Sequence, residues 1–339
     1  MNIPICFCSD NNYAQHLAVA LVSVLKNSGK TDEFSFFVLD AGITGENKNK
    51  ISELKKIKDF QIEYINIDMS LFKTFPDNST YISAASYARL LISSLLKKTD
   101  KVIYLDCDLV VCGSLEELFN ENIDDYHLAA VEDIYYYHSR RALKRDTESF
   151  YANSGVMLIN LNKWRRDDIE EKLLAVPKTA ATELVHRDQD IINIVLNKTT
   201  KPLNLKWNVM DCFFRVANHM EIHPLKKDIK KAWRFPSIIH YTGLIKPWDK
   251  PYMPKGGLYL KYLKYTPFQE SYIALINQQK PFNEFHRDFI KRMYYTARHL
   301  ISPVIAVRRF KDSFGIRLFM FFFLKLEKFK ITKTEEFPC

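Results

Sequence analysis

The sequence is poor in the features that mark disordered, fibrous or disulfide-stapled proteins. It has only nine glycines and thirteen prolines in 339 residues, and it contains neither a fixed-period repeat nor a Ser/Gly-rich linker. Its six cysteines include no CxxC pair and are too sparse for a disulfide scaffold, so we expect mostly buried thiols in a reducing compartment. Their spacing is also wrong for zinc. With 47% hydrophobic and 26% charged residues, the chain is predicted to be globular.

Two further absences bear on location. The first eight residues lack a basic leader, and Asp10 interrupts their apolar run, so we expect no export and a cytoplasmic protein. A membrane-spanning helix needs about 20 apolar residues. The apolar run at residues 318–324 is far too short for that.

Positive charge is concentrated at the end of the chain. Of the formal net charge of +9, residues 270–339 contribute 13 Lys and Arg against 7 Asp and Glu, alternating with aromatic residues. This composition favours a helical extension over residues 266–339 that lies on an anionic membrane surface. The alternative is that its aromatic side chains pack on the rest of the protein. We expect no nucleic acid partner.

Apolar periodicity predicts strands alternating with helices before residue 266. Such alternation is typical of an α/β domain, whose ligands bind beyond the carboxyl ends of the strands. The predicted strands are residues 3–8, 34–39, 61–67, 101–105, 128–131, 156–159 and 238–241, and the predicted helices are 13–26, 47–57, 83–97 and 189–197.

Two carboxylates follow an almost wholly apolar predicted strand. In an extended chain, Asp106 and Asp108 project to one face about 6.6 Å apart, while Cys107 points into the core. The next helix does not need them as caps, because Ser114 and Glu117 already form a capping box. Adjacent carboxylates need positive compensation, and oxygen ligands favour Mg²⁺, Mn²⁺ or Ca²⁺. Spacing alone leaves a metal site and a solvated turn as alternatives.

Seven ordered segments carry a resemblance to a known family. They are Cys8-Ser-Asp-Asn-Asn-Tyr-Ala14, Phe37-Val-Leu-Asp-Ala-Gly42, Ser86-Tyr-Ala-Arg-Leu90, Tyr104-Leu-Asp-Cys-Asp108, Tyr151-Ala-Asn-Ser-Gly-Val156, Asp188-Gln-Asp190 and His240-Tyr-Thr-Gly-Leu-Ile-Lys-Pro-Trp248. Over residues 3–265 the chain resembles the retaining glycosyltransferases of family 8. The resemblance is greatest to bacterial enzymes that add galactose or glucose to a lipopolysaccharide or lipooligosaccharide core.

The resemblance implies a fold, a donor and a place of action. The fold is of the GT-A type, with a mixed, mainly parallel sheet in a catalytic domain of residues 1–265. The donor is a UDP-hexose, bound with Mn²⁺ or, alternatively, Mg²⁺. The acceptor is a lipid-linked oligosaccharide, so the enzyme would be peripheral on the cytoplasmic face of the inner membrane.

The resemblance also assigns the metal and the diphosphate. Asp106 and Asp108 would hold the metal with His240, although taken alone such a histidine is more typical of a satisfied core residue. Gly243 would let the backbone approach the phosphates, and Lys246 would supply a cation. Metal and lysine would together stabilise the charge that develops on the leaving UDP.

The nucleotide end of the site is assigned to the segment after the first strand. By resemblance, Cys8, Asp10, Asn12 and Tyr13 line it, and Cys107 lies at the donor site between the paired acids. For Asp10, the alternative is a cap in a plain strand-to-helix turn.

Arg89 is assigned by resemblance to the sugar or the diphosphate. On helical spacing it lies two positions from the face formed by Tyr87 and Leu91, so we do not expect it in the core. A solvated arginine is the alternative.

The donor sugar is assigned to three further residues. Asn153 and Asp188 correspond to residues that hydrogen-bond the sugar hydroxyls, and Gln189 to the residue beneath the anomeric face. Asp188 as the N-cap of the helix at 189–197 is an alternative. Because an amide is a poor substitute for the carboxylate nucleophile of retaining glycosidases, we hypothesise front-face substitution.

Other functions fit parts of the sequence. A sugar-phosphate nucleotidyltransferase would need a Gly-rich phosphate loop near the first strand, where this chain has Ser9-Asp-Asn-Asn-Tyr13. A non-enzymatic binder of anionic lipid or nucleic acid leaves the paired acids, His240 and Gln189 unexplained. Within the family, a protein glycan or another lipid-linked chain is an alternative acceptor. Suggested acceptor contacts are Tyr81 and residues 185–187, 210–214 and 244–245.

Overall fold

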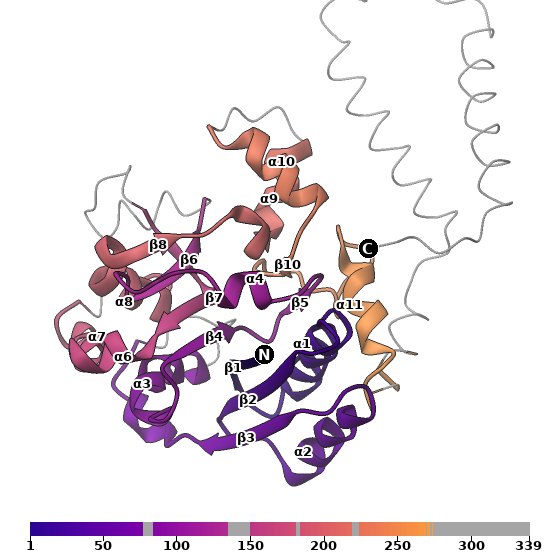
Figure 1. Ribbon diagram of the computed structural model, residues 1–339, viewed down its shortest axis with the longest axis horizontal. Helices are drawn as coiled ribbons and strands as arrows, with labels where there is room; N and C mark the ends of the chain where they lie inside the picture. Colours follow the sequence, from indigo (N-terminus) through magenta and orange to yellow (C-terminus); the bar gives the residue numbers. More distant parts are fainter. Residues whose placement is uncertain are drawn as a thin grey trace, which may run out of the picture. The chain divides into compact units, whose positions relative to one another are not determined.

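The structure is a computed structural model (Figure 1). It describes residues 1–76, 84–134, 150–180, 184–218 and 224–268, together with 270, 271 and 273. These residues belong to one unit that spans residues 1–277. The extension expected over residues 266–339 lies almost wholly outside the described residues, so its helical character and its membrane contact stay predictions.

A seven-stranded sheet forms the centre of the domain, in the order β3-β2-β1-β4-β7-β6-β8. Strands β3, β2, β1 and β4 are parallel, β7 is antiparallel to β4 and β6, and β8 is parallel to β6. The predicted mixed, mainly parallel sheet is therefore confirmed. The strands are β1 Asn2–Ser9, β2 Glu33–Asp40, β3 Gln61–Asn66, β4 Lys101–Leu105, β6 Leu128–Glu132, β7 Ala152–Asn160 and β8 Thr200–Pro202.

A smaller sheet of three short strands lies next to the end of β4. It consists of β5 Leu109–Val111, β10 Ile238–His240 and β9 Val209–Met210. Strand β10 was predicted, whereas the similarly short β5 and β9 were not. Pairing of β10 with β5 sets His240 opposite Leu109. A histidine late in the chain thus lies beside Asp108.

Helices cover both faces of the central sheet. In Figure 1, α1 and α11 lie on one side and α3, α6, α7 and α8 on the other. None of the described helices is long and apolar enough to cross a membrane. The α-helices are α1 Ala14–Lys26, α2 Gly45–Ser52, α3 Ile92–Leu95, α4 Glu116–Phe119, α6 Leu161–Arg166, α7 Ile169–Ala180, α8 Asp188–Leu196, α9 Asp211–Asn218, α10 Lys226–Arg234 and α11 Gly256–Leu263. The 3₁₀-helices are η1 Glu53–Lys56, η2 Met69–Phe72, η3 Ala84–Leu91, η4 Asn197–Thr199 and η5 Leu205–Trp207.

Each central strand contributes to two hydrophobic cores. In β4, Ile103 and Leu105 belong to the core that includes α1, whereas Val102 and Tyr104 belong to the core that includes α6 and α8. This alternation explains the continuous apolar run of β4, because both faces of the strand are covered. A strand with no polar face then ends abruptly in two carboxylates.

The helix predicted at residues 83–97 is mostly a 3₁₀-helix. Eight residues form η3, and a single α-helical turn, α3, follows. With three residues per turn, side chains at i and i+3 lie on one face. Ser86 and Arg89 therefore point the same way, and both contact Asp188.

The capping box predicted before α4 is not formed, because Leu115 and not Ser114 is the N-cap of this helix. Ser114 Oγ still accepts the backbone N–H of Glu116 at 3.1 Å. Glu117 instead pairs with Lys206, at 2.7 Å. The first N–H of α4 is therefore bonded by Ser114 and not by the paired aspartates.

The cysteines of the described residues are free thiols. Cys6, Cys107 and Cys212 are buried, and Cys8 and Cys112 are half-buried. Burial raises the pKa of Cys8 to about 12, so its thiol is protonated at neutral pH. The prediction of mostly buried thiols is confirmed for these five.

Candidate functional site

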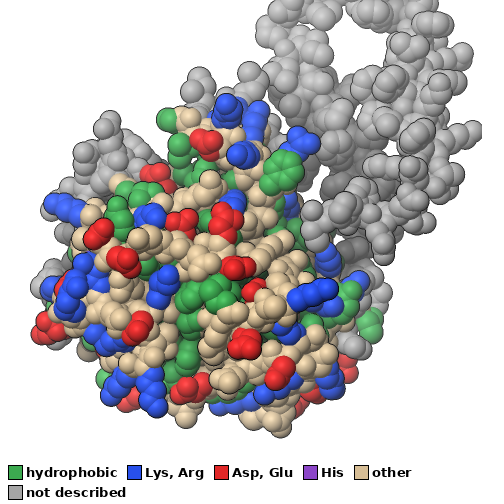
Figure 2. Space-filling view, viewed as in Figure 1, with side chains coloured by type: hydrophobic (Ala, Val, Ile, Leu, Met, Phe, Trp, Pro, Cys, Tyr) green, Lys and Arg blue, Asp and Glu red, His purple; other side chains and the backbone are tan. Residues whose placement is uncertain are grey.

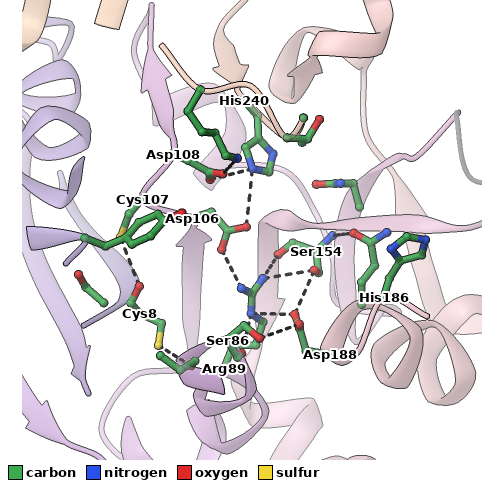
Figure 3. Close-up of a pocket in the computed structure, with 18 of the residues that line it drawn as sticks. Cys8, Ser86, Arg89, Asp106, Cys107, Asp108, Ser154, His186, Asp188 and His240 are labelled. Atoms are coloured by element: carbon green, nitrogen blue, oxygen red, sulfur yellow. Dashed lines mark hydrogen bonds and ion pairs between the residues drawn. The ribbon is translucent and has the colours of Figure 1, made fainter. Parts of the chain in front are cut away.

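A cavity of about 650 Å³ lies beyond the carboxyl ends of β1 and β4 (Figure 3). Of the residues assigned above to the metal and the donor, only Asn12 does not line this cavity; its side chain is exposed. The candidates that do line the cavity are Cys8, Asp10, Tyr13, Arg89, Asp106, Cys107, Asp108, Asn153, Asp188, Gln189, His240, Gly243 and Lys246.

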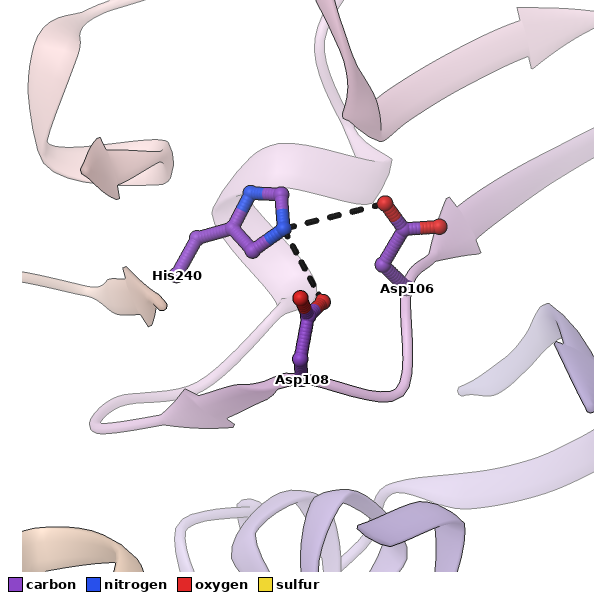
Figure 4. A group of neighbouring side chains, drawn as sticks. All are labelled: Asp106, Asp108 and His240. Carbon is purple, nitrogen blue, oxygen red and sulfur yellow. Dashed lines mark hydrogen bonds and ion pairs between the residues drawn. The ribbon is translucent and has the colours of Figure 1, made fainter. Parts of the chain in front are cut away.

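Three of these side chains converge on one point. The candidate ligand atoms of Asp106, Asp108 and His240 all lie within 4.8 Å of one another. His240 Nε2 is 3.1 Å from Asp108 Oδ1 and 3.7 Å from Asp106 Oδ2, and both carboxylates face it (Figure 4). Two carboxylate oxygens and one imidazole nitrogen suit Mn²⁺ or a similar divalent cation. The residues therefore fit the metal that the resemblance implies.

A buried asparagine orients the imidazole. Asn208 is 0% exposed, and its Oδ1 lies 3.0 Å from Nδ1 of His240. Its Nδ2 donates to Asn153 Oδ1 at 2.8 Å, which fixes the direction of the amide. Since an amide oxygen only accepts, Nδ1 carries a proton, and Nε2 is the ring nitrogen that faces the carboxylates. No sequence pattern pointed to Asn208, because it follows a short 3₁₀-helix and precedes a two-residue strand.

Strand β7 comes very close to the three converging side chains at Gly155. The backbone N–H of Asp106 donates to the Gly155 carbonyl at 2.8 Å. A Cβ at position 155 would lie 2.1 Å from Cε1 of His240 and 2.7 Å from Oδ2 of Asp106. The glycine therefore provides the space in which the histidine lies.

Charge compensation differs between the two paired acids. Lys246 Nζ lies 2.6 Å from Asp108 Oδ2 and also donates to the Tyr241 carbonyl. Burial alone would raise the pKa of Asp108, but Lys246 and His240 more than offset it and hold the pKa well below its usual range. For His240, burial alone would lower the pKa, yet Asp108 and Asp106 raise it.

Asp106 is compensated by Arg89, and this corrects an expectation. Arg89 is only 5% exposed, so the expectation that it lies outside the core is wrong. Its guanidinium lies 2.8 Å from Asp106 Oδ1 and 3.1 Å from Asp188 Oδ2, and it donates to the Ser154 carbonyl at 3.0 Å (Figure 3). Residues 85 and 87–90 of η3 are all buried, so this segment has no solvated face at Arg89. Burial alone would lower the pKa of Arg89, but Asp106 and Asp188 raise it.

Asp188 is not the N-cap of α8. It is the first residue of that helix, and Arg187 precedes it with φ 48° and no side-chain cap. Its Oδ1 accepts from Ser86 Oγ at 2.9 Å, and its Oδ2 from Ser154 Oγ at 3.4 Å. Burial raises the pKa of Asp188, and Arg89 opposes that rise. Its hydrogen bonds thus hold the cavity wall together.

Gln189 is held at both ends of its amide. Its Oε1 accepts the Ser154 N–H at 3.1 Å, and its Nε2 donates to Asp133 Oδ2 at 3.3 Å. Asn153 donates to the same Asp133 oxygen at 2.9 Å. Asp133 was missed in the sequence, although it directly follows strand β6, as Asp106 follows β4.

The nucleotide end combines a turn with an aromatic cluster. Asp10 Oδ1 accepts the Tyr13 N–H at 3.0 Å, so Asp10 does hold the turn before α1, as its alternative role required, while lining the cavity. Tyr13 lies edge-on to Trp248, and His16 stacks on Trp248 with ring centroids 3.5 Å apart. Burial lowers the pKa of His16 to about 3, so this ring is neutral. The cluster ties the segment around Trp248 to α1.

Gly243 does not offer its N–H to the cavity. The group donates to Asp211 Oδ2 at 2.7 Å, and a Cβ on Gly243 would lie 2.9 Å from the same oxygen. Burial raises the pKa of Asp211. The glycine thus permits a close approach, but in this structure the approach is to a carboxylate at the start of α9.

The suggested acceptor contacts divide into three groups. Val185, His186 and Leu244 line the cavity, and Val185 and Leu244 are exposed at it. Arg187, Ile245 and residues 210–214 do not line it. Tyr81 lies outside the described residues.

Comparison with known proteins identifies a family. The family model for glycosyl transferase family 8 matches residues 4–251. General stress protein A of Bacillus subtilis (strain 168) is 30% identical over 279 residues, covering 80% of this chain and 96% of that protein. Lipopolysaccharide 1,2-glucosyltransferase of Escherichia coli is 30% identical over 248 residues, covering 70% and 71%.

The fold is similar to that of a solved galactosyltransferase structure. The crystal structure of the galactosyltransferase LgtC in complex with donor and acceptor sugar analogs superposes with a TM-score of 0.71 at 30% identity. The match covers 78% of this chain and 96% of that one, and it includes the α/β arrangement with a mixed sheet. The chain belongs to glycosyl transferase family 8.

Proposed function

We propose that the protein is a retaining, metal-dependent transferase that moves galactose or glucose from a UDP-sugar to a lipopolysaccharide core sugar. The observation that carries this proposal is the convergence of Asp106, Asp108 and His240 in a cavity of about 650 Å³. Both hexoses are supported, because one similar protein is named as a glucosyltransferase and another as a galactosyltransferase.

A divalent cation, Mn²⁺ or Mg²⁺, would be held by these three residues. When bound, it would supply Lewis-acid stabilisation of the charge on the leaving diphosphate. Lys246 forms an ion pair with Asp108, one of the three residues that would hold the cation, and it would add a second positive charge. Lys246 and His240 hold the pKa of Asp108 low, so this carboxylate stays ionised and able to bind the cation at neutral pH.

Retention without a covalent enzyme intermediate is part of the proposal. Both oxygens of Asp188 accept hydrogen bonds, from Ser86 and from Arg89, which reduces their nucleophilicity. The amide of Gln189 is bonded at both ends and is a poor nucleophile in any case. We therefore assign Asp188 and Asn153 to the sugar hydroxyls and Gln189 to the space beneath the anomeric carbon. The leaving phosphate oxygen would take the acceptor proton.

The decisive experiment compares donors and metal ligands. UDP-glucose, UDP-galactose and their N-acetyl forms are screened by thermal shift with Mn²⁺, and slow UDP release is then followed with the best donor. We expect Asp108→Asn to abolish both Mn²⁺ binding and UDP release, while Asp124→Asn, an exposed matched control, changes neither. UDP release by Asp108→Asn at the wild-type rate would overturn the metal-dependent mechanism, and trapping of a sugar on Asp188 or Gln189 would overturn front-face substitution.

The acceptor side is proposed to lie at a membrane. A lipid-linked oligosaccharide on the cytoplasmic face of the inner membrane would meet an enzyme held there by residues 266–339. Deletion of residues 300–339 is expected to move the protein from the membrane to the soluble fraction. An unchanged, salt-insensitive distribution would contradict this role.

A further inference from the structure

Helix α10 carries a line of cations on one exposed face. Lys227, Lys230, Lys231 and Arg234 recur at i, i+3, i+4 and i+7 and are named the basic stripe. All four are exposed, and within the described residues none forms an ion pair. Figure 2 shows Lys and Arg side chains gathered over α10, next to a hydrophobic area.

The opposite face of α10 attaches the helix to the domain. Ile229 and Ala232 are buried, and Trp233 packs against Phe214 of α9 with ring centroids 5.5 Å apart. Lys255 lies over the Trp233 ring, 4.8 Å from its centroid. Packing of α10 therefore depends on its apolar face and does not require the basic stripe.

The basic stripe is unfavourable for the isolated helix. Its members form like-charge pairs at i,i+3 and i,i+4, which destabilise a helix. The helix dipole favours cations only near the C-terminus, so it accounts for Lys231 and Arg234 but opposes Lys227 in the first turn. Asp228, the one acidic residue of α10, forms no ion pair with the basic stripe, so the stripe is free to meet an anionic partner.

An exposed aromatic residue extends the basic stripe. Phe235 directly follows α10 and is 64% exposed, with the Arg234 guanidinium 5.3 Å from its ring centroid. Cations beside an exposed aromatic side chain suit the interface of an anionic bilayer, where the ring enters the headgroup region. A flat row of exposed side chains is less suited to enclosing a free phosphate ion.

We propose that the basic stripe and Phe235 bind the surface of an anionic lipid bilayer. Helix α9, which α10 packs against, begins at Asp211, whose carboxylate accepts the N–H of Gly243 in the cavity wall. Binding through α10 thus holds one side of the cavity against the membrane. The inference does not rest on the proposed function, because binding to vesicles requires no sugar. The residues that it concerns are other than residues 266–339.

The test measures partition of the full chain onto vesicles of phosphatidylcholine alone or with phosphatidylglycerol. The variant K227Q/K230Q/K231Q/R234Q removes the basic stripe. The control K55Q/K73Q/K97Q/K98Q removes four exposed lysines elsewhere and changes the net charge equally. Thermal unfolding and UDP release in solution check that each variant is folded.

Several cations act together at a surface, so we expect the stripe variant to bind phosphatidylglycerol vesicles at least tenfold more weakly than wild type. The control should change by less than threefold. Phe235→Ser should reduce the binding that persists in 0.5 M NaCl, where charge interactions are screened.

Three results would overturn the proposal. One is equal vesicle binding by the stripe variant and the control. Another is full competition by inorganic phosphate at millimolar concentration, which would assign the stripe to a small anion. The third is loss of binding to a labelled DNA oligonucleotide with no change on vesicles, which would assign it to nucleic acid.

Discussion

The substitution Gly155→Ala tests how the three converging side chains are packed. Its Cβ would lie 2.1 Å from Cε1 and 2.9 Å from Nδ1 of His240, and 2.7 Å from Oδ2 of Asp106. Ordinary contact begins at 3.4 Å, so one of the groups must move by about 1.3 Å. The alanine methyl itself is rigid, and the displacement therefore falls on the histidine or on strand β7.

Neither group has room to move without cost. His240 is 3% exposed and is held by Asn208 at 3.0 Å and by Asp108 at 3.1 Å. Strand β7 is fixed beside β4 by the 2.8 Å bond from the Asp106 N–H to the Gly155 carbonyl. Overpacking of this kind costs about 1 to 3 kcal/mol of unfolding free energy. Because a candidate metal ligand is displaced, Mn²⁺ affinity should fall by about tenfold to a hundredfold.

Two measurements check this prediction. Free Mn²⁺ is counted by electron paramagnetic resonance during titration, and urea unfolding is followed without metal. Gly113→Ala is the matched control, since its Cβ would meet no atom within 4 Å. If Gly155→Ala kept both the Mn²⁺ affinity and the stability of wild type, the close packing of β7 against His240 would have no energetic role.

The remaining predictions concern other buried polar groups. Arg89→Met leaves two carboxylates without their cation, so the unfolding free energy in urea should fall by about 3 to 5 kcal/mol, and a fall below 1 kcal/mol would contradict the role given to the ion pairs. Asn208→Ala should weaken Mn²⁺ binding by about tenfold to a hundredfold, whereas Asn208→Asp keeps an acceptor for His240 and should recover most of it; equal affinities would show that His240 needs no orientation. Because His16 has a pKa near 3 when folded and near 6.5 when unfolded, the unfolded state binds the extra proton and stability falls as the pH drops below 6.5. Between pH 7.5 and pH 5 this amounts to about 2 kcal/mol, which should be absent in His16→Gln; identical pH profiles would refute it.

The sequence predicted the central sheet because long apolar strands carry their own periodicity. Each of the seven strands predicted from residue 3 to residue 241 coincides with an observed strand. The short strands β5, β8 and β9 were not predicted, because they owe their pairing to neighbours far along the chain. Because the chain belongs to a glycosyltransferase family, the family match favours neither a sugar-phosphate nucleotidyltransferase nor a non-enzymatic binder.

The candidate site was predictable only where the family pattern named it. The pattern placed Asp106, Asp108 and His240 together, although 132 residues separate the last two. Burial of Arg89 was mispredicted, because the segment was assumed to have one solvated face, whereas residues 85 and 87–90 are all buried. Asn208 could not be predicted at all, since its role depends on a hydrogen bond to a side chain that tertiary packing brings beside it.

The charges of the cavity are expected to couple the proposed binding of a metal to that of a nucleotide. Among the described residues, Asp106, Asp108 and Asp188 form ion pairs with two permanent cations, Arg89 and Lys246, so with a neutral imidazole the group carries a net negative charge. An anionic diphosphate is disfavoured there until a divalent cation reverses the balance. We therefore expect UDP to bind at least tenfold more tightly in the presence of Mn²⁺ than in its absence, and Mn²⁺ to bind more tightly by the same factor with UDP, because such coupling is reciprocal. Calorimetric titration of UDP with and without Mn²⁺ measures this factor. Equal affinities would mean that the chain's own cations already neutralise the cavity, and the paired acids after β4 would then need another explanation.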